Sequence, residues 1–191
     1  MRRHRTILIG GAGSGKSTLV DRLAGNEFDR LIPPTIGVDF RVVDEGGLAP
    51  VPIRIWDTAG AERFQAVMTA YYRNVEFCLL VFDASRRNWD AQVRFWASEL
   101  RKHSPECRIF LVGNKIDRGS VVPMERAVRT ARDMKAIGVA FVSAKHMGTA
   151  ELRGLVSPLF ETIRPDKPLP EIRQPLLGGR APKPPSCCRI A

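Results

Sequence analysis

The chain has 191 residues, which suffices for one ordinary domain with a tail and excludes two full domains. Apolar residues make up 44% of it and charged residues 26%, as in soluble globular proteins with a sizeable core. The formal net charge is +10. Residues 1–164 contain 25 Lys and Arg against 18 Asp and Glu, and residues 165–191 contain 5 against 2, so the excess of positive charge is diffuse. Such an excess favours anionic partners but does not distinguish a membrane from a nucleic acid.

Short apolar runs alternate with segments of helical periodicity as far as residue 164. Two of the runs flank Glu45-Gly46-Gly47, which predicts antiparallel strands joined by a turn. Other runs are apolar almost throughout, as in strands that helices cover on both faces. The sequence therefore predicts an α/β fold, a three-layer sandwich with a mostly parallel six-stranded sheet and one antiparallel edge strand. The expected strands are residues 6–9, 40–43, 51–56, 77–82, 109–112 and 139–142, and the expected helices are residues 17–24, 93–100, 124–131 and 152–163.

The distribution of proline divides the chain into two parts. Seven of the 14 prolines lie within residues 165–191, a stretch without apolar periodicity or enough backbone donors for a helix or a strand. We therefore expect a globular domain over residues 1–164 and a flexible Pro-rich tail over residues 165–191. Inside the last predicted helix, Pro158 removes the N–H that would bond to Gly154, which predicts a kink or a broken turn there.

The glycine-rich segment after the first predicted strand carries the first chemical motif. Residues 10–17 read Gly-Gly-Ala-Gly-Ser-Gly-Lys-Ser and match G-x-x-x-x-G-K-[ST] in the strand–helix context that the motif requires. Backbone N–H groups would surround phosphate oxygens, Lys16 would reach the β- and γ-phosphates, and the Ser17 hydroxyl would hold Mg²⁺. The alternative is a glycine-rich turn with a chance lysine. The expected phosphate contacts are Gly11, Ala12, Gly13, Ser14, Gly15, Lys16, Ser17 and Thr18.

A second motif, Trp56-Asp57-Thr58-Ala59-Gly60, ends another predicted strand. Asp57 can bind Mg²⁺ through water, and Gly60 allows the backbone to approach a terminal phosphate closely. Alone, Asp-x-x-Gly is a common turn. Its position after the phosphate-binding motif favours the functional interpretation, because ligands bind at the carboxyl ends of parallel strands.

Two motifs at later strand ends predict a base site. In Asn114-Lys115-Ile116-Asp117, the Asp117 carboxylate can accept two hydrogen bonds from guanine, whereas adenine lacks that donor pair. Asn114 and the stem of Lys115 would shape and cover the site. The alternative is a polar turn that ends in an aspartate. The triplet Ser143, Ala144 and Lys145 supports the base site, since the Ala144 N–H would meet guanine O6.

The four motifs, in this order and at this spacing, resemble those of small GTPases of the Ras superfamily, over residues 6–164. The resemblance implies the P-loop NTPase fold, GTP and GDP as ligands, Mg²⁺ as cofactor, and hydrolysis of GTP to GDP and phosphate. It also implies a Rab-like switch that recruits effectors in intracellular vesicle trafficking. The segments similar to those that mark Rabs are Ile36-Gly37-Val38-Asp39-Phe40, Glu62-Arg63-Phe64, Tyr71-Tyr72-Arg73-Asn74 and Leu80-Val81-Phe82-Asp83.

The resemblance also assigns roles to single residues. The Thr35 hydroxyl would bind Mg²⁺ and its N–H the γ-phosphate, so that Lys16, Thr35 and Gly60 would act in catalysis. Phe28 would stack edgewise near the guanine. The expected effector surface consists of Ile36, Gly37, Phe40, Trp56 and Tyr71. For its aromatic residues, plain core packing is the alternative.

Ala61 departs from the family pattern. It stands where the family has a glutamine that orients the attacking water, and its methyl group makes no hydrogen bond. Intrinsic hydrolysis by Ras is already slow, about 10⁻⁴ s⁻¹, and we expect it to be slower here. An activating protein that supplies an arginine and a glutamine in trans would sustain stimulated turnover. A second interpretation is a membrane adaptor that stays bound to GTP without hydrolysing it.

The end of the sequence predicts a lipid anchor. Cys187 and Cys188 resemble the Rab signal for double geranylgeranylation, and residues 188–191 also read as C-a-a-X, with an alanine that suggests farnesyl. Two lipid chains anchor a protein stably where one binds marginally. The alternative is two unmodified cysteines. With no disulfide framework and no signal peptide expected, the resemblance implies the cytosolic face of intracellular membranes, cycling with the cytosol.

Partners follow from the same resemblance. They are effectors, an exchange factor, a GTPase-activating protein, a GDP dissociation inhibitor and an escort protein. A nucleic-acid-binding GTPase is a distant alternative, motivated by the charge of +10, but we expect no RNA-binding domain, and the basic residues are not interleaved with aromatics. An ATP-using enzyme is disfavoured by Asn114 and Asp117. We expect a monomer.

Overall fold

The computed structural model describes residues 5–43, 53–60, 65–161 and 176–177. The predicted turn at residues 45–47, the segment 61–64 with Ala61, and the two C-terminal cysteines lie outside these residues. The elements are β1 (Arg5–Ile9), α1 (Lys16–Leu23), β2 (Val38–Val43), β3 (Ile53–Thr58), α2 (Gln65–Tyr72), β4 (Phe77–Asp83), α3 (Trp89–His103), β5 (Arg108–Asn114), the 3₁₀ helix η2 (Ile116–Arg118), α4 (Met124–Asp133), β6 (Gly138–Phe141), α5 (Thr149–Glu161) and β7 (Leu176–Leu177).

The strands form one sheet in the order β2-β3-β1-β4-β5-β6-β7. Only β2 is antiparallel to its neighbour, with Phe40 opposite Trp56 in the pair with β3. The strands β3, β1, β4, β5, β6 and β7 run parallel to one another. The predicted mostly parallel sheet with one antiparallel edge strand is confirmed, and the carboxyl ends of the parallel strands meet at one edge of the sheet.

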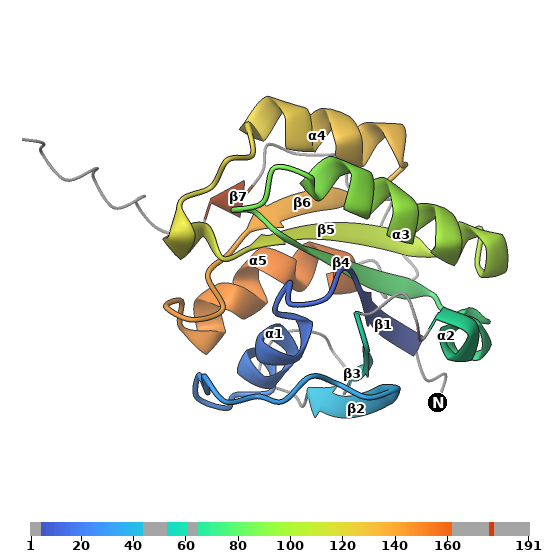
Figure 1. The fold of residues 1–191 in the computed structure, drawn as a ribbon, viewed down its shortest axis with the longest axis horizontal. Coiled ribbons are helices and arrows are strands. Elements are labelled where there is room, and N and C mark those ends of the chain that lie inside the picture. Colours follow the sequence, from blue (N-terminus) through green and yellow to red (C-terminus); the bar gives the residue numbers. More distant parts are fainter. Residues whose placement is uncertain (1–4, 44–52, 61–64, 162–175, 178–191) are drawn as a thin grey trace, which may run out of the picture.

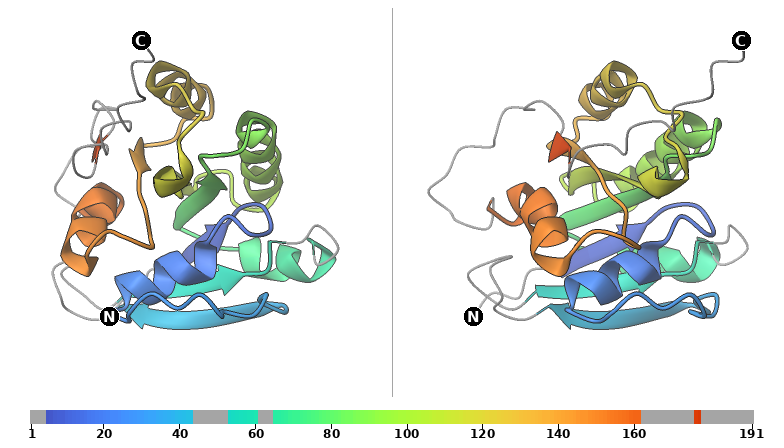
Figure 2. Two further views of the ribbon diagram at one scale, coloured as in Figure 1. Left: turned by 60° about the vertical axis from the view of Figure 1, so that its left-hand side comes forward. Right: turned by 90° about the vertical axis from the view of Figure 1, so that its left-hand side faces the viewer.

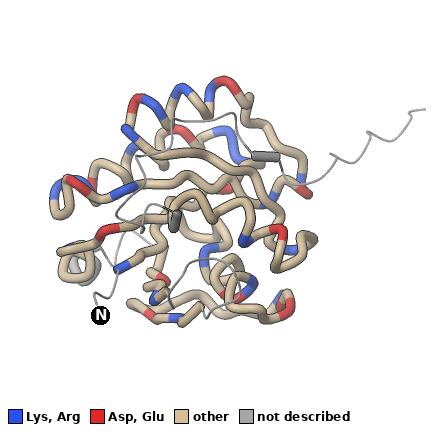
Figure 3. Tube along the Cα trace, turned by 180° about the vertical axis from the view of Figure 1, so that it is seen from behind, with Lys and Arg blue, Asp and Glu red and all other residues tan. Residues whose placement is uncertain are grey.

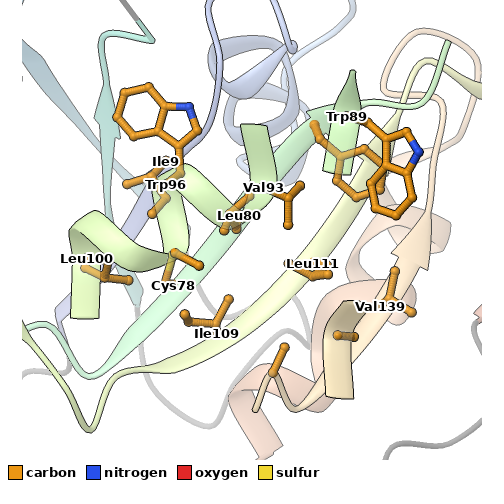
Figure 4. Close-up of a cluster of buried hydrophobic side chains, with 14 of the residues drawn as sticks. Ile9, Cys78, Leu80, Trp89, Val93, Trp96, Leu100, Ile109, Leu111 and Val139 are labelled. Atoms are coloured by element: carbon orange, nitrogen blue, oxygen red, sulfur yellow. The ribbon is translucent and has the colours of Figure 1, made fainter. Parts of the chain in front are cut away.

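Helices cover both faces of this sheet, α3 and α4 on one side and α1 and α5 on the other (Figures 1 and 2). A buried apolar cluster fills each interface. Strand β4 is buried along its whole length between the two clusters, which explains why its sequence is apolar almost throughout. Figure 4 shows the α3 side of the sheet, with Trp89, Val93, Trp96 and Leu100 packed on Cys78, Leu80, Ile109 and Leu111.

Besides the short 3₁₀ helix η2, two elements were not predicted from the sequence, α2 and β7. Helix α2 has apolar residues at nearly every position, so it lacks the stripe that reveals an amphipathic helix. Strand β7 lies within the tail, and the prediction that the tail forms no strand is wrong at these two residues. They begin a proline-free interval between Pro175 and Pro182, keep their N–H groups, and pair in parallel with Ala140 and Phe141 at the edge that β6 presents.

Of the two outcomes predicted at Pro158, a kink or a broken turn, the broken turn is wrong, because α5 continues as a helix to Glu161. Proline cannot donate to the carbonyl of Gly154. The Ser157 hydroxyl donates to that carbonyl instead, at 3.0 Å. A side chain thus supplies the hydrogen bond that the backbone lacks, and the helix persists.

Charges are spread over the described surface. Figure 3 shows basic and acidic positions interspersed along the trace, in agreement with the diffuse excess read from the sequence. None of the helices in the described ranges combines the length and the apolar character needed to cross a membrane.

Candidate nucleotide-binding site

A cavity of about 700 Å³ opens at the carboxyl ends of the central strands. Its volume lies in the range of small-molecule sites. All four sequence motifs contribute to its lining, although they are up to 130 residues apart in the chain. The predicted contacts that line it are Ala12, Gly13, Gly15, Lys16, Ser17, Thr18, Phe28, Thr35, Gly60, Asn114, Lys115, Asp117, Ala144 and Lys145. Of the other predicted contacts, Gly11 lines a neighbouring cavity of about 420 Å³, and Ser14, Asp57 and Ser143 are buried.

The phosphate loop, residues 10–15, connects β1 to α1 and directs the N-terminus of α1 at the cavity. Gly15 immediately precedes the helix with φ of 89°, in the left-handed region. A Cβ atom at this position would lie 2.4 Å from Asn114 Nδ2, so glycine is required by backbone conformation and by space. The resulting turn, with the free N–H groups of the helix N-terminus, is suited to an anion.

Lys16 is buried beneath this loop. Its ammonium donates to the carbonyl oxygens of Gly10, at 2.9 Å, and Gly11, at 3.1 Å. Burial lowers the pKa of Lys16 to about 8, the nearby Asp57 carboxylate opposes this shift, and the charge of Lys115 adds to it. A buried cation that is held only by two carbonyl dipoles, and whose pKa is lowered, would be stabilised by an anionic ligand.

Three oxygen-bearing side chains from three segments meet beside Lys16. The hydroxyl oxygens of Ser17 and Thr35 are 2.8 Å apart, and Thr35 donates to Asp57 Oδ2 at 3.3 Å. The other carboxylate oxygen of Asp57, Oδ1, is buried without a partner among the described residues. Burial raises the pKa of Asp57, although the hydrogen bond from Ser17 and the charge of Lys16 act against it. An all-oxygen group with an unsatisfied carboxylate oxygen fits Mg²⁺, the cation predicted from the sequence.

The opposite side of the cavity is built around Asn114, the last residue of β5. Its Nδ2 donates to the carbonyl of Ser14 at 3.0 Å, and its Oδ1 accepts from the backbone N–H groups of Lys115 at 2.8 Å and Ala144 at 3.1 Å. Asn114 is therefore a brace between three loops, and it also lines the cavity. The Ala144 N–H, predicted for guanine O6, already has an acceptor in this structure.

Asp117 directs its carboxylate into the cavity. One of its oxygens, Oδ1, accepts from the Ser143 hydroxyl at 2.6 Å. Asp117 is otherwise exposed and lines the cavity, so the rest of its acceptor capacity is open to a ligand. Ser143, predicted only as part of a weak triplet, thus fixes the orientation of the carboxylate that can select guanine.

Asp83 is a polar residue at this site that the sequence motifs did not identify as functional. It ends β4, and its Oδ2 accepts from the Lys115 ammonium at 2.9 Å. The same ammonium donates to the carbonyl of Gly13 in the phosphate loop. An acidic residue at the carboxyl end of a buried parallel strand is the signal that was available for it.

The predicted effector residues lie to one side of the cavity. Ring centroids of Phe40 and Trp56 are 5.6 Å apart, and those of Trp56 and Tyr71 are 5.8 Å apart. Phe40 is exposed, whereas Trp56 and Tyr71 are half-buried against the core. Ile36 is 85% exposed. The three aromatic rings thus form a contiguous cluster at the surface. The alternative of core packing applies only in part, to the buried portions of Trp56 and Tyr71.

Comparison with known proteins gives a consistent result. The model of the Ras family matches residues 5–163. The Ras-related protein RABA1c of Arabidopsis thaliana is 40% identical over 126 residues, which cover 63% of this chain and 57% of the relative. The Ras-related protein RIC2 of Oryza sativa subsp. japonica is 42% identical over 124 residues, with the same coverage of 63% and 57%.

The Ras-related protein Rab-24 of Dictyostelium discoideum matches over a longer stretch. It is 38% identical over 170 residues, which cover 85% of this chain and 79% of the relative. The chain therefore spans little more than half of the length of the two plant relatives (57% of each) and most of the length of Rab-24.

Proposed function

Because this chain belongs to the Ras family of small GTPases and is Rab-like, we propose that it is a GTP/GDP-dependent switch that recruits effectors in vesicle trafficking. The observation that carries the proposal is the cavity itself, where an anion-binding loop, an oxygen-rich cation site and a carboxylate suited to guanine lie together. These are the three chemical parts of a guanosine phosphate bound with Mg²⁺.

In this proposal the phosphate loop and Lys16 bind the phosphate groups. A polyphosphate gives the buried ammonium a counter-charge that stabilises its protonated form. Ser17, Thr35 and Asp57 hold Mg²⁺, which when bound neutralises charge on the β- and γ-phosphate oxygens. Asp117, oriented by Ser143, selects guanine because adenine would leave the carboxylate without its two donors.

The switching parts are the segments around Thr35 and Gly60. A Cβ atom on Gly60 would lie 2.4 Å from Lys16 Nζ and 2.7 Å from Ala12 N, so the Gly60 backbone is close to the phosphate end of the cavity. The two segments are also joined, because the Ala59 N–H donates to the carbonyl of Gly37 at 2.9 Å. Loss of the outermost phosphate on hydrolysis releases both segments together, and with them the surface around Ile36 and Phe40.

Ala61 motivates two versions of this function. In the first, intrinsic hydrolysis is very slow and an activating protein supplies the missing groups; in the second, the chain is a GTP-bound adaptor that does not hydrolyse. Single-turnover hydrolysis by the wild-type chain and by Ala61→Gln, each with and without a matched activating protein, separates them. Equal rates for the two chains without the activating protein would remove Ala61 as the cause of slow turnover.

Membrane attachment rests on the sequence alone. Prenylation at Cys187 and Cys188, as two geranylgeranyl chains or one farnesyl chain, places the protein on the cytosolic face of intracellular membranes. The escort protein and the GDP dissociation inhibitor are then its carriers through the cytosol. Intact-mass measurement on protein from native cells tests this, and two unmodified cysteines would contradict it.

Calorimetry tests the central proposal. Protein stripped of nucleotide is titrated with GDP, GTP and ATP in the presence of Mg²⁺. We expect tight binding of both guanine nucleotides and none of ATP. Heat from ATP equal to that from GTP would show that Asp117 does not select the base, and heat from none of the three would exclude a nucleotide site.

A further inference from the structure

We propose that Asp83 is a positioning residue that sets how long a bound nucleotide stays on this protein, by holding Lys115 across the phosphate loop. The inference rests on the proposed guanine-nucleotide function and adds a determinant of its kinetics that lies outside the nucleotide-binding motifs.

The carboxylate of Asp83 is held from both sides. It is only 4% exposed at the end of β4. Its Oδ1 accepts from the Ser85 hydroxyl at 2.6 Å and from the Ser85 N–H at 3.0 Å, and its Oδ2 accepts from Lys115 Nζ at 2.9 Å. Burial alone would raise the pKa of Asp83, but the hydrogen bonds from Ser85 and Lys115 outweigh it and hold that pKa below its usual value. The carboxylate is therefore an anchor whose orientation is fixed and whose charged form is favoured.

Lys115 reaches from this anchor over the loop that would carry phosphate. Its backbone is in the left-handed region, with φ of 67°, and its ammonium contacts both Asp83 and the carbonyl of Gly13. A Cβ atom on Gly15 would lie 3.7 Å from the Lys115 Cε, so the stem passes close to the turn before α1. A ligand that enters or leaves the cavity between the phosphate loop and Asp117 passes beside this stem.

The positive charges near the phosphate loop explain why a carboxylate is needed beside Lys115. The ammonium groups of Lys16 and Lys115 both donate to carbonyl oxygens of the phosphate loop, so two like charges lie against the same short segment and repel each other. Without Asp83, the half-buried Lys115 ammonium would keep only the carbonyl acceptor of Gly13, near the buried cation Lys16. We therefore expect Lys115 to leave the loop more often when Asp83 is neutral, and a bound nucleotide to escape faster.

A neighbouring arginine provides a matched control. Arg86 Nε lies 3.6 Å from Asp83 Oδ2, which is beyond hydrogen-bond distance, and its side chain is 51% exposed. Solvent screens the charge of such a side chain, so this pair contributes less than the 2.9 Å bond from Lys115. Arg86→Gln removes a charge at the same carboxylate without touching the bond between Asp83 and Lys115.

The test is the release rate of a fluorescent GDP analogue from the full chain, measured with excess unlabelled GDP. Asp83→Asn keeps the shape and an acceptor for Ser85 but loses the charge pair with Lys115. We expect release to be about 10- to 100-fold faster, the range for loss of a charged hydrogen bond, and Arg86→Gln to stay within about twofold of wild type. Both GDP and a GTP analogue should be affected equally, because Asp83 acts through Lys115 and not through Thr35 or Gly60, the residues expected at the outermost phosphate.

A double-variant cycle separates positioning from a merely structural effect. If Asp83 acts through Lys115, then Asp83→Asn adds no further acceleration in a chain that already carries Lys115→Met. Additive effects of the two substitutions, or an unchanged rate in Asp83→Asn, would overturn the inference. Should Asp83→Asn fail to fold, Ser85→Ala removes only the orienting hydroxyl and should still speed release severalfold; an unchanged rate there would also count against it.

The same experiment distinguishes failure of the proposed nucleotide binding from failure of the proposed role of Asp83. A wild-type chain that retains no guanine nucleotide overturns the proposed function, and this inference with it. A wild-type chain that retains the nucleotide, with variants that release it at the wild-type rate, overturns only the role of Asp83.

Discussion

The two sides of the candidate nucleotide cavity are built differently. On the base side, Asn114 is buried and bonded to three loops, and Lys115 is held by an ion pair with a buried carboxylate. On the switch side, residues 26–37 form neither helix nor strand, and Ile36 is 85% exposed. The switch side is linked to the core mainly through hydroxyl contacts of Thr35 and one backbone bond from Ala59 to Gly37.

This difference corresponds to what each side must do. Selection of a base requires donors and acceptors that keep their positions when the ligand is absent, because movement would allow the wrong base to be satisfied. Sensing an outer phosphate requires a segment that is stable only when the phosphate is present, and such segments have few buried contacts. The contrast predicts that loss of a buried bracing side chain on the base side, such as Asn114, lowers folding stability. Substitutions on the switch side should instead reduce the discrimination between the GTP-bound and GDP-bound states.

The largest effect is expected for Asn114→Ala. It leaves the Ser14 carbonyl and the Ala144 N–H without their side-chain partner in a buried site, so the free energy of unfolding should fall by about 2–4 kcal/mol. Urea unfolding of nucleotide-free protein measures this. Asn88→Ala is the matched control, since Asn88 is exposed and its side chain makes no capping bond to α3. Equal losses for the two variants would contradict the bracing role.

Asp117→Asn should change base preference with little effect on stability. The amide replaces one acceptor by a donor, so affinity for GDP should fall by about 10- to 100-fold, and a base with a carbonyl in place of the guanine amine should be favoured relative to guanine. Competition between GDP and xanthosine diphosphate measures the ratio. Asp133→Asn, an exposed carboxylate on α4, should leave the ratio unchanged. A preference that does not move would mean that another group selects the base.

The sequence predicted the location of the site better than its internal bonding. Motifs at strand ends place Lys16, Asp57 and Asp117 around one cavity because parallel strands end at the same edge of the sheet, and this holds without knowledge of any side chain. The bond from Asn114 to Ser14 spans 100 residues of sequence, and the pair of Asp83 with Lys115 spans 32. No local pattern encodes such distant partners.

The errors in the predicted fold have a similar origin. Helix α2 was missed because its residues are apolar all round and give no periodicity. Pro158 was expected to break α5, yet the hydroxyl one residue earlier bonds to the orphaned carbonyl of Gly154. Strand β7 was missed because two leucines gain a partner only when the edge of β6 is near. Each of these three features depends on contacts with other parts of the structure, which rules based on local sequence do not consider.

Binding of GDP should take up a proton near pH 8. Burial lowers the pKa of Lys16 to about 8, so this lysine is neutral in about half of the stripped molecules at that pH. Phosphate binding should restore its proton. The unfolded chain binds this proton more tightly than the folded chain does. The unfolding free energy of stripped protein should therefore rise between pH 8 and about 10.5, the ordinary pKa of a lysine. Calorimetry at pH 8 in two buffers of different ionisation enthalpy should show uptake of about half a proton. No uptake would mean that Lys16 is fully protonated before the ligand arrives.

The smallest effect on stability is expected for Thr35→Ala, and it bears most directly on the contrast between the two sides. The substitution removes hydroxyl contacts to Ser17 and Asp57 in a part-buried position, so the unfolding free energy should change by less than about 1 kcal/mol. The preference for a GTP analogue with Mg²⁺ over GDP should nevertheless be lost, and Thr35→Ser, which keeps the hydroxyl, should retain it. The test is to measure, for each variant, the unfolding free energy and the ratio of the affinities for the GTP analogue and for GDP. A loss of stability as large as that of Asn114→Ala would show that the switch side is part of the rigid frame, because a segment that costs that much to loosen cannot respond to one phosphate.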